Sequence, residues 1–203
     1  MNTNRLETFA DGVFAIAATL LILNVDAQVA EDVSDLGGQL LRIWPSYAAY
    51  AVTFFTIGIV WVNHHTVMSQ IDRADRVFLF LNIGFLMFVA FAPFPTRLIA
   101  EHIIRGEGAR AATLTYGITL VLMAVLFNAL WLYASVGARL LRPDHDPSVV
   151  KGITRSYRLG LPMYLAATLI SIVSPTVGAI LFAAIAALYI LESSLFGRTK
   201  QSG

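Results

Sequence analysis

The chain has 203 residues, of which 57% are hydrophobic and only 13% are charged, with a net charge of +1 and no cysteine. Because soluble domains carry about 25% charged residues, this composition excludes an ordinary water-soluble protein. The small net charge and the scattered basic residues argue against a nucleic-acid surface. The lack of cysteine excludes disulfides, thiolate metal sites and cysteine nucleophiles. We therefore expect an all-α integral membrane protein that forms one domain over residues 1–203.

Six apolar segments approach or exceed the length of about 20 residues that a membrane-spanning helix needs. The predicted spans are residues 8–25, 44–68, 77–99, 111–137, 155–174 and 176–196. Polar residues 26–42 separate the first two spans. Ser174 and Pro175 mark a tight turn between the last two, because proline cannot continue a helix and restricts the residue before it. Pro162 predicts either a kink in the fifth helix or a later start of that helix.

The distribution of lysine and arginine predicts that both termini are cytoplasmic. With the amino terminus inside, the cytoplasmic side holds ten basic residues: Arg5, Arg73, Arg76, Arg139, Arg142, Lys151, Arg155, Arg158, Arg198 and Lys200. The outer side holds four: Arg42, Arg97, Arg105 and Arg110. This excess follows the positive-inside rule. An alternative, in which the first 30 or so residues are a cleaved signal peptide, is opposed by Glu7 and Asp11, since the n-region of such a peptide is positively charged.

Asp11 lies near the inner end of the first span, where an ionisable side chain is costly and usually faces protein or water. The second span runs antiparallel to the first, so its inner end "WVNHHT" lies at a similar depth, and the third span begins at the same side. The polar side chains available there are Trp61, Asn63, His64, His65 and Asn82. We expect a network in which the carboxylate accepts hydrogen bonds from an indole, imidazole or amide. The alternative is that Asp11 only caps the helix or reaches the interface, and the sequence does not decide which histidine is involved.

An aliphatic stripe follows Asp11 along the same helix. At 100° per residue, Ile16, Leu20 and Leu23 share a narrow face with Thr19 beside it, and Asp11 points about 140° away from Ile16. Such stripes in membrane helices usually contact lipid or other helices, so periodicity alone leaves a pore-lining role open.

Three motifs resemble those of one channel family. The segment Arg5-x-x-x-Phe9-Ala10-Asp11 resembles the R-x-x-x-F-S-D signature in the first helix of bacterial homologues of transmembrane protein 175, a potassium channel family. "WVNHH" at 61–65 resembles the family's second-helix W-x-x-H-H pattern, and "APFPT" at 92–96 resembles its third-helix P-F-x-T element. Ala10 replaces the serine of the signature, which removes one hydroxyl from the motif.

The resemblance implies a homotetramer in a bacterial inner membrane, in which four copies of the first helix surround a path for potassium. It implies no cofactor and no carbonyl filter, and a hydrophobic constriction at Ile16 with further apolar layers at Leu20 and Leu23. Thr19 corresponds to the motif threonine. "TVG" at 176–178 lacks the Tyr-Gly of the usual potassium filter, so we assign no filter there.

Other function classes are disfavoured to different degrees. An enzyme is disfavoured because no phosphate loop or nucleophile elbow is present, and because the adjacent His64 and His65 project about 100° apart, which makes a poor metal pair. A secondary transporter, with or without coupling to protons, would normally show internal repeats. That reading and a non-conducting membrane scaffold remain alternatives that ion flux distinguishes. Titration of the histidines would make conduction depend on pH, and whether protons permeate is left open.

Overall fold

The computed structural model describes residues 3–25 and 36–199, and the side chains of its last helix as far as residue 191. The helices are α1 (Thr3–Leu20), the 3-10 turn η1 (Leu21–Asn24), α2 (Leu36–Arg42), α3 (Trp44–Ser69), α4 (Arg76–Phe91), α5 (Pro93–His102), α6 (Ala109–Ser135), the 3-10 turn η3 (Val136–Ala138), α7 (Pro147–Val173) and α8 (Pro175–Thr199). Within the described ranges, the β-structure is a single bridge between Ile71 and Leu141. The expected all-α fold is confirmed.

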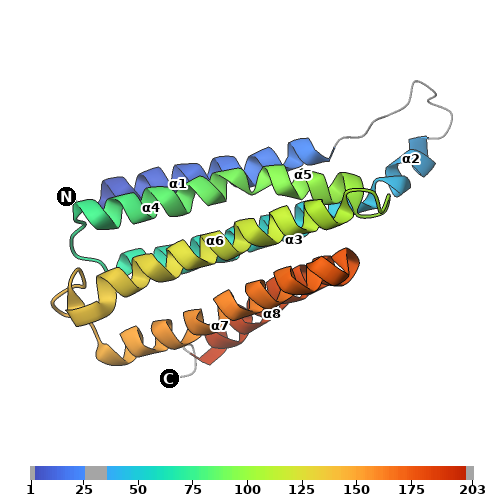
Figure 1. The fold of residues 1–203 in the computed structure, drawn as a ribbon. Coiled ribbons are helices and arrows are strands. Elements are labelled where there is room, and N and C mark those ends of the chain that lie inside the picture. The colour runs from blue at the N-terminus through green and yellow to red at the C-terminus, as the bar shows by residue number, and fades with distance from the viewer. Residues whose placement is uncertain (1–2, 26–35, 200–203) are drawn as a thin grey trace.

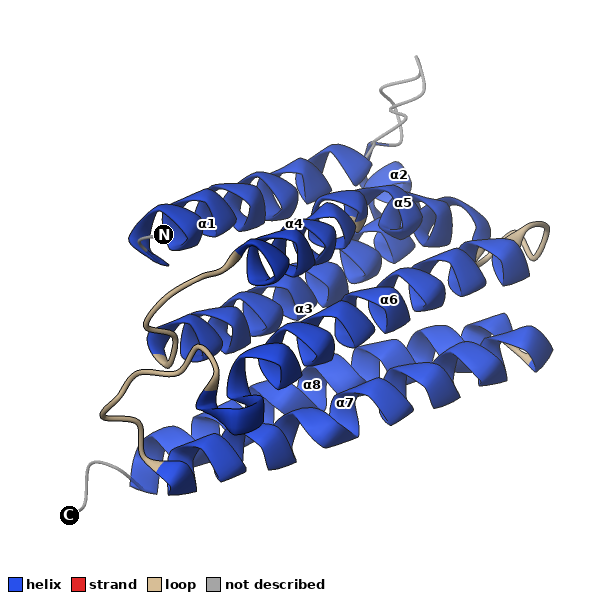
Figure 2. Ribbon diagram, turned by 60° about the vertical axis from the view of Figure 1, so that its left-hand side comes forward, coloured by secondary structure: helices blue, strands red, loops and turns tan. Residues whose placement is uncertain are grey.

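The long helices run side by side in one bundle (Figure 1). α1 packs against α3 and α4 at one side of the molecule. α6 occupies the middle, where it contacts α4, α5, α7 and α8. α7 and α8 form a hairpin on the side opposite α1, as the turned view also shows (Figure 2). The start of α1 and the start of α7 lie toward the same end of the bundle (Figure 1).

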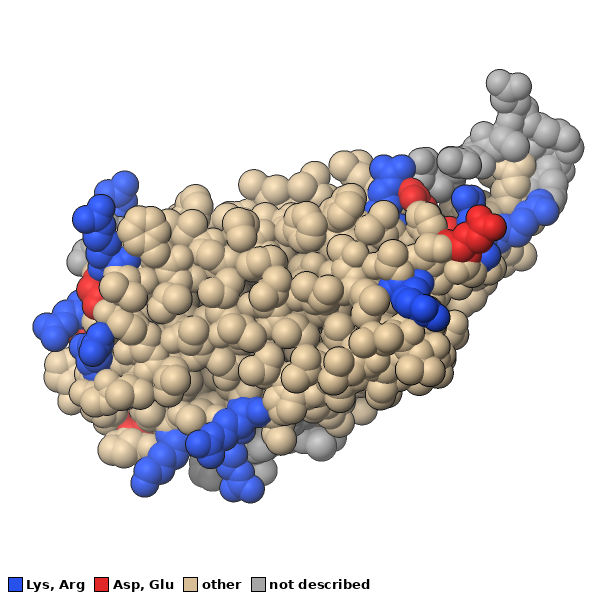
Figure 3. Space-filling view, viewed as in Figure 1, with Lys and Arg blue, Asp and Glu red and all other residues tan. Residues whose placement is uncertain are grey.

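Five of the described helical segments are long and apolar enough to cross a membrane, with α4 and α5 counted as one segment, and Pro175–Leu191 is a shorter apolar helix. The middle of the visible surface carries almost no charged side chain, and the Lys, Arg, Asp and Glu residues gather toward the two ends (Figure 3). A surface that is uncharged over this length suits hydrocarbon rather than water.

The fifth predicted helix starts earlier than its sequence suggested. α7 begins at Pro147, so the expectation of a late start near residue 155 or beyond is wrong. Asp146 caps this helix, because its side chain accepts a hydrogen bond from the Ser148 amide at 2.7 Å, and Pro147 suits the first helical position. These two start signals outweigh Pro162, which lies exposed inside a continuous helix.

The third predicted span contains two helices. α4 ends at Phe91 and α5 begins at Pro93, because Pro93 and Pro95 have no N–H to donate to the carbonyls four residues earlier. Ala92 closes the junction by donating to the Val89 carbonyl at 3.2 Å. The predicted polar segment at 26–42 also contains the helix α2; residues 26–35 lie outside the described residues.

Three buried hydroxyl groups fasten α5 to α3 and α6. Thr96 donates to Thr53 at 3.0 Å, and the Thr53 hydroxyl lies 3.1 Å from the hydroxyl of Tyr116. All three residues are at most 3% exposed. Because buried hydroxyls must be paired, this series of hydrogen bonds fixes the position of α5, which follows the proline break.

Close contact between helices in the centre depends on Gly117 of α6. A Cβ atom at this position would lie 2.5 Å from the Thr168 hydroxyl on α7 and 2.8 Å from the Phe182 ring on α8. The missing side chain therefore lets α6 approach both members of the hairpin.

The two loops at the α1 start of the bundle are joined to each other. Asp72 donates through its amide to the Leu140 carbonyl at 2.9 Å, and the Arg142 amide donates to the Gln70 carbonyl at 3.0 Å. Asp75 caps α4 by accepting from the Phe78 amide at 2.9 Å, and its second oxygen accepts from the Tyr133 hydroxyl at 2.7 Å. The amide of Phe78, followed by the Tyr133 hydroxyl, holds the pKa of the Asp75 carboxyl below its ordinary value.

This cap makes stability depend on pH. Because the folded-state pKa of Asp75 lies below the unfolded value of about 3.9, the stabilisation is present above that value and is lost as the pH falls through the folded pKa. We expect Asp75→Ala to lower the free energy of unfolding by about 1 kcal/mol at pH 7 and by less at pH 3. Thermal unfolding of detergent-solubilised protein between pH 3 and 7 measures this. Asp72→Asn in the same loop is the control, and an equal loss at both pH values would contradict the assignment.

Candidate pore helix and its polar contacts

α1 has one face that its own subunit buries. The buried residues are Leu6, Ala10, Phe14 and Ala17, continued by Leu21 in η1, and their spacing of three and four residues forms one side of the helix. They pack against α3 and α4. Ala10, which replaces the serine of the family signature, has no exposed surface. The position therefore belongs to the packed face of α1.

A second face of α1 carries the aliphatic stripe. Ile16 is 61% exposed, Leu20 43% and Leu23 68%. The chain tightens into the 3-10 turn η1 from Leu21, where successive side chains turn by about 120° rather than 100°. Ile22 is also exposed. The stripe is an apolar surface that the subunit itself does not cover.

Thr19 lies beside the stripe and binds its own helix. Its hydroxyl donates to the carbonyl of Ala15 at 2.9 Å or of Ile16 at 3.0 Å. Because the proton is directed at the backbone, the hydroxyl oxygen presents its lone pairs outward from the helix. Thr19 therefore offers an acceptor, rather than a donor, at the exposed surface.

Asp11 accepts a hydrogen bond from the indole nitrogen of Trp61 at 2.8 Å, which joins α1 to α3. One turn earlier on α1, Glu7 lies 2.8 Å from the Nδ1 atom of His65, also on α3. Asp11, Trp61 and His65 are exposed at the subunit surface, and Glu7 is half-buried. Two parallel polar contacts thus hold the start of α1 against the end of α3.

His64 has a different partner. Its Nε2 atom lies 2.8 Å from the Oδ1 atom of Asn82 on α4, and both side chains are buried. The imidazole stacks on the Phe85 ring, with centroids 5.6 Å apart, and lies at the same distance from Phe14 of α1. The polar groups that the sequence predicts at one depth therefore form two separate sets. One is the buried contact between α3 and α4, and the other is the two exposed contacts between α1 and α3. The pairing of His65 with Glu7 was not predicted, although Glu7 precedes Asp11 by one helical turn.

The remaining motif residues lie at the surface or line a cavity. Arg5 and Phe9 are exposed and border a shallow hollow at the start of α1 together with Asn4 and Thr8. Asn63 accepts a hydrogen bond from the Tyr157 hydroxyl at 3.1 Å through its backbone carbonyl. Its side chain borders a cavity on the other side of α3. The described residues contain no group of three His, Asp or Glu side chains suited to a metal ion.

A contact that the sequence did not predict anchors the far end of α1. The side-chain amide of Asn24 donates to the backbone carbonyl of Pro93 at 2.8 Å. Pro93 begins α5 at the proline break, so the end of η1 is held where α4 gives way to α5. An asparagine directly after an apolar run was the available signal. α1 is therefore fixed by polar contacts at both ends.

The sequence of this chain is similar to those of known proteins. The family profile described as "Endosomal/lysosomal potassium channel TMEM175" matches residues 5–93. A protein of Chamaesiphon minutus named a potassium channel is 42% identical over 85% of this chain and 85% of its own length. A second protein with that name, from Streptomyces collinus, is 42% identical over 78% of this chain and 77% of its own.

A solved structure agrees with these sequence matches. The crystal structure of a lysosomal potassium-selective channel TMEM175 homolog from Chamaesiphon minutus superposes with a TM-score of 0.84. The two chains are 37% identical, and the match covers 94% of this chain and 97% of the other. The apolar helices and these matches identify the protein as an integral membrane protein. The chain belongs to the TMEM175 family.

Proposed function

We propose that this protein is a potassium channel whose ion path is lined by the exposed stripe of α1. The observation that carries the proposal is that Ile16, Leu20 and Leu23 are apolar, aligned and largely exposed, while another face of the same helix is packed against α3 and α4. Relatives that match most of this chain are named potassium channels. The match of α1 to the family profile adds support, since the profile begins at Arg5.

A path lined by one helix needs several copies of the subunit. We place four copies around a common axis in a bacterial inner membrane, each with six membrane spans and both termini in the cytoplasm. Closed cyclic symmetry is the usual arrangement of identical subunits. The larger number of basic residues at the end of the bundle where α1, α4 and α7 begin supports this orientation.

The gate in this proposal is hydrophobic. A ring of Ile16 side chains is narrow and offers no hydrogen bonds, so it expels water and leaves an ion without replacement for its hydration shell. Opening widens the ring until partly hydrated ions pass. Potassium is favoured over sodium because the larger ion is easier to dehydrate, and the outward-facing oxygen of Thr19 supplies an acceptor one turn away. The "TVG" segment at 176–178 takes no part, since these residues lie in the first turns of α8.

Replacing Ile16 by asparagine tests the gate. An amide side chain would keep water in the constriction, so we expect passive potassium flux into liposomes to rise by about tenfold, equivalent to a barrier lowered by ~1.4 kcal/mol. Ile172→Asn is the matched control, because Ile172 is also exposed but lies on α7, away from α1.

The same assay separates the rival functions. Flux that requires a second substrate would indicate a secondary transporter, and no flux in any variant would indicate a scaffold. Flux that is equal in the wild type and in Ile16→Asn would exclude Ile16 as the gate.

Replacing Asp11 by alanine tests the role of the α1–α3 contacts. Loss of the bond to Trp61 would free the start of α1, at a cost of roughly 1–3 kcal/mol per subunit for a charge-assisted hydrogen bond. We expect less assembled protein, measured by crosslinking and size-exclusion chromatography, with the ion preference of the remaining channels unchanged.

Two further variants make this test specific. Asp11→Asn keeps an acceptor oxygen and should restore part of the assembly. Glu7→Gln keeps a side-chain oxygen that can accept a hydrogen bond from His65, so this variant should assemble as the wild type does. A normal yield of tetramer with altered potassium-to-sodium preference in Asp11→Ala would contradict a purely positioning role.

A further inference from the structure

One side of α7 changes in chemical character along its length. A series of exposed residues on this helix is spaced alternately by four and three positions, so its members share one face. In order, they are Lys151, Arg155, Arg158, Pro162, Leu165, Leu169 and Ile172. We refer to the three cationic residues at the start of the series as the basic face of α7. The same side of the helix is apolar over the rest of its length.

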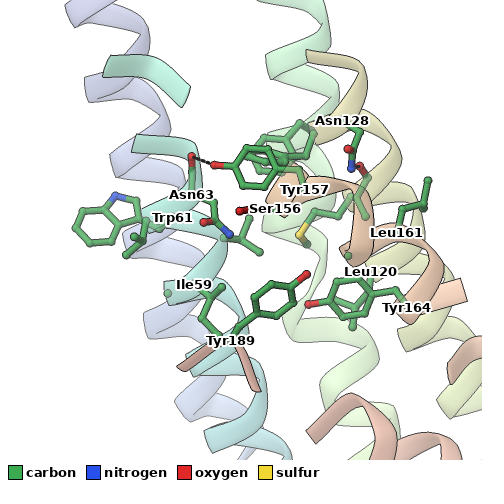
Figure 4. A pocket seen from close by; sticks show the side chains of 18 of the residues that line it. Ile59, Trp61, Asn63, Leu120, Asn128, Ser156, Tyr157, Leu161, Tyr164 and Tyr189 are labelled. Carbon is green, nitrogen blue, oxygen red and sulfur yellow. Dashed lines mark hydrogen bonds between the residues drawn. The ribbon is translucent and has the colours of Figure 1, made fainter. Parts of the chain in front are cut away.

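The opposite side of α7 packs inside the bundle. Ile153, Gly160 and Ala167 are buried there. The hydroxyl of Tyr157 donates to the Asn63 carbonyl of α3 at 3.1 Å, along the dashed line in Figure 4. Because the α7–α8 hairpin lies on the side of the bundle opposite α1, the exposed side of α7 faces away from α1 and toward the surrounding membrane (Figure 1).

The length of α7 places its basic face at the edge of the hydrocarbon. The helix has 27 residues and is about 40 Å long, whereas the hydrocarbon core is about 30 Å thick. With Val173 at one boundary, the hydrocarbon begins about 20 residues earlier, near Thr154. Helical side chains lean toward the amino-terminal end of their helix. Arg155 and Arg158 therefore extend their charged groups toward the level of the lipid phosphates.

The positive-inside rule alone does not account for this arrangement. That rule counts basic residues near the ends of membrane spans and is independent of the helix face, whereas the basic face of α7 occupies a sector of about 60°. Basic side chains gather along the lower edge of the visible surface, where α7 begins (Figure 3). Other cations at this end have partners. The Arg139 guanidinium lies 4.7 Å from the centre of the Tyr133 ring, and Arg142 lies 3.9 Å from Asp144.

A phospholipid has the same two parts in the same order, with a charged phosphate at the membrane surface and acyl chains in the hydrocarbon. The arginine guanidinium matches phosphate oxygens with several N–H donors, and each basic side chain near an anionic bilayer surface adds to the attraction. We propose that the basic face of α7 binds the headgroup of an anionic phospholipid of the phosphatidylglycerol class, with an acyl chain along Leu165 and Leu169. This site is separate from the stripe of α1.

Photolabelling of the full chain in lipid nanodiscs tests this site. The probe is a phosphatidylglycerol with a diazirine in its acyl chain, diluted into phosphatidylcholine. We expect saturable labelling of α7 peptides that unlabelled phosphatidylglycerol competes away and added phosphatidylcholine does not. The labelling should weaken at high salt, because salt screens the attraction. Both leaflets of a nanodisc have the same composition, so the result does not depend on the orientation of the chain.

Charge-matched variants make the test specific. Arg155→Gln combined with Arg158→Gln removes two charges from the basic face, so we expect unlabelled phosphatidylglycerol to compete roughly tenfold less well. Arg155→Lys combined with Arg158→Lys keeps both charges and should retain most of the binding. Arg105→Gln combined with Arg110→Gln is the control, because these exposed residues flank the start of α6 at the opposite end of the bundle (Figure 1).

A second comparison keeps the test valid if the glutamine variant folds poorly. In the wild type, a photoreactive phosphatidylcholine with the same diazirine should label α7 less than the phosphatidylglycerol does. Equal labelling by the two lipids, labelling spread evenly over the lipid-facing helices, or no change in a folded glutamine variant would overturn the site. Competition by free glycerol 3-phosphate as strong as that by the lipid would also overturn it, since the ligand would then be a soluble phosphate. None of these outcomes depends on potassium conduction.

Discussion

The structure depends on the packing of α1 against α3 and α4, because this helix has apolar residues on two different faces and its own subunit covers only one. Leu6, Phe14 and Leu21 lie in the core with at most 5% of their surface exposed. Ile16 and Leu23 on the other face are more than 60% exposed. The hydrophobic effect that drives burial in water does not act between helices in lipid, so exposure alone is compatible with lipid as well as with other helices. The proposed role of the outer face depends on the assembly of several copies.

Polar contacts determine which face of α1 points outward. The bonds from Asp11 to Trp61 and from Glu7 to His65 join α1 to α3 at one end, and Asn24 joins it to the start of α5 at the other. Polar partners inside a membrane are hard to exchange, because water does not replace a broken bond there. A rotation of α1 about its axis would break these contacts. The rest of the bundle therefore acts as a support that holds one helix at a fixed angle.

The sequence was sufficient for the features that follow from hydrophobic length and spacing. The helices are close to the predicted segments, and the buried and exposed faces of α1 follow from a period of 3.6 residues. Features set by contacts between distant residues were not predictable. The order of polar residues did not reveal that His65 pairs with Glu7 while His64 pairs with Asn82. The residue types of Asp146 and Pro93 were local signals for a helix start and a helix break. Spans assigned from hydrophobic length alone did not use these signals.

The central claim is that the stripes of different copies face one another around an axis. Because the chain has no cysteine, a single cysteine at position 16 tests this directly by oxidative crosslinking in membranes. We expect Ile16→Cys to form disulfide-linked pairs of subunits, while Ile172→Cys, which is also exposed but lies on α7, does not. If the cysteine at position 16 never crosslinks and instead reacts with lipid-soluble maleimides, the stripe contacts acyl chains, and α1 does not line a pore.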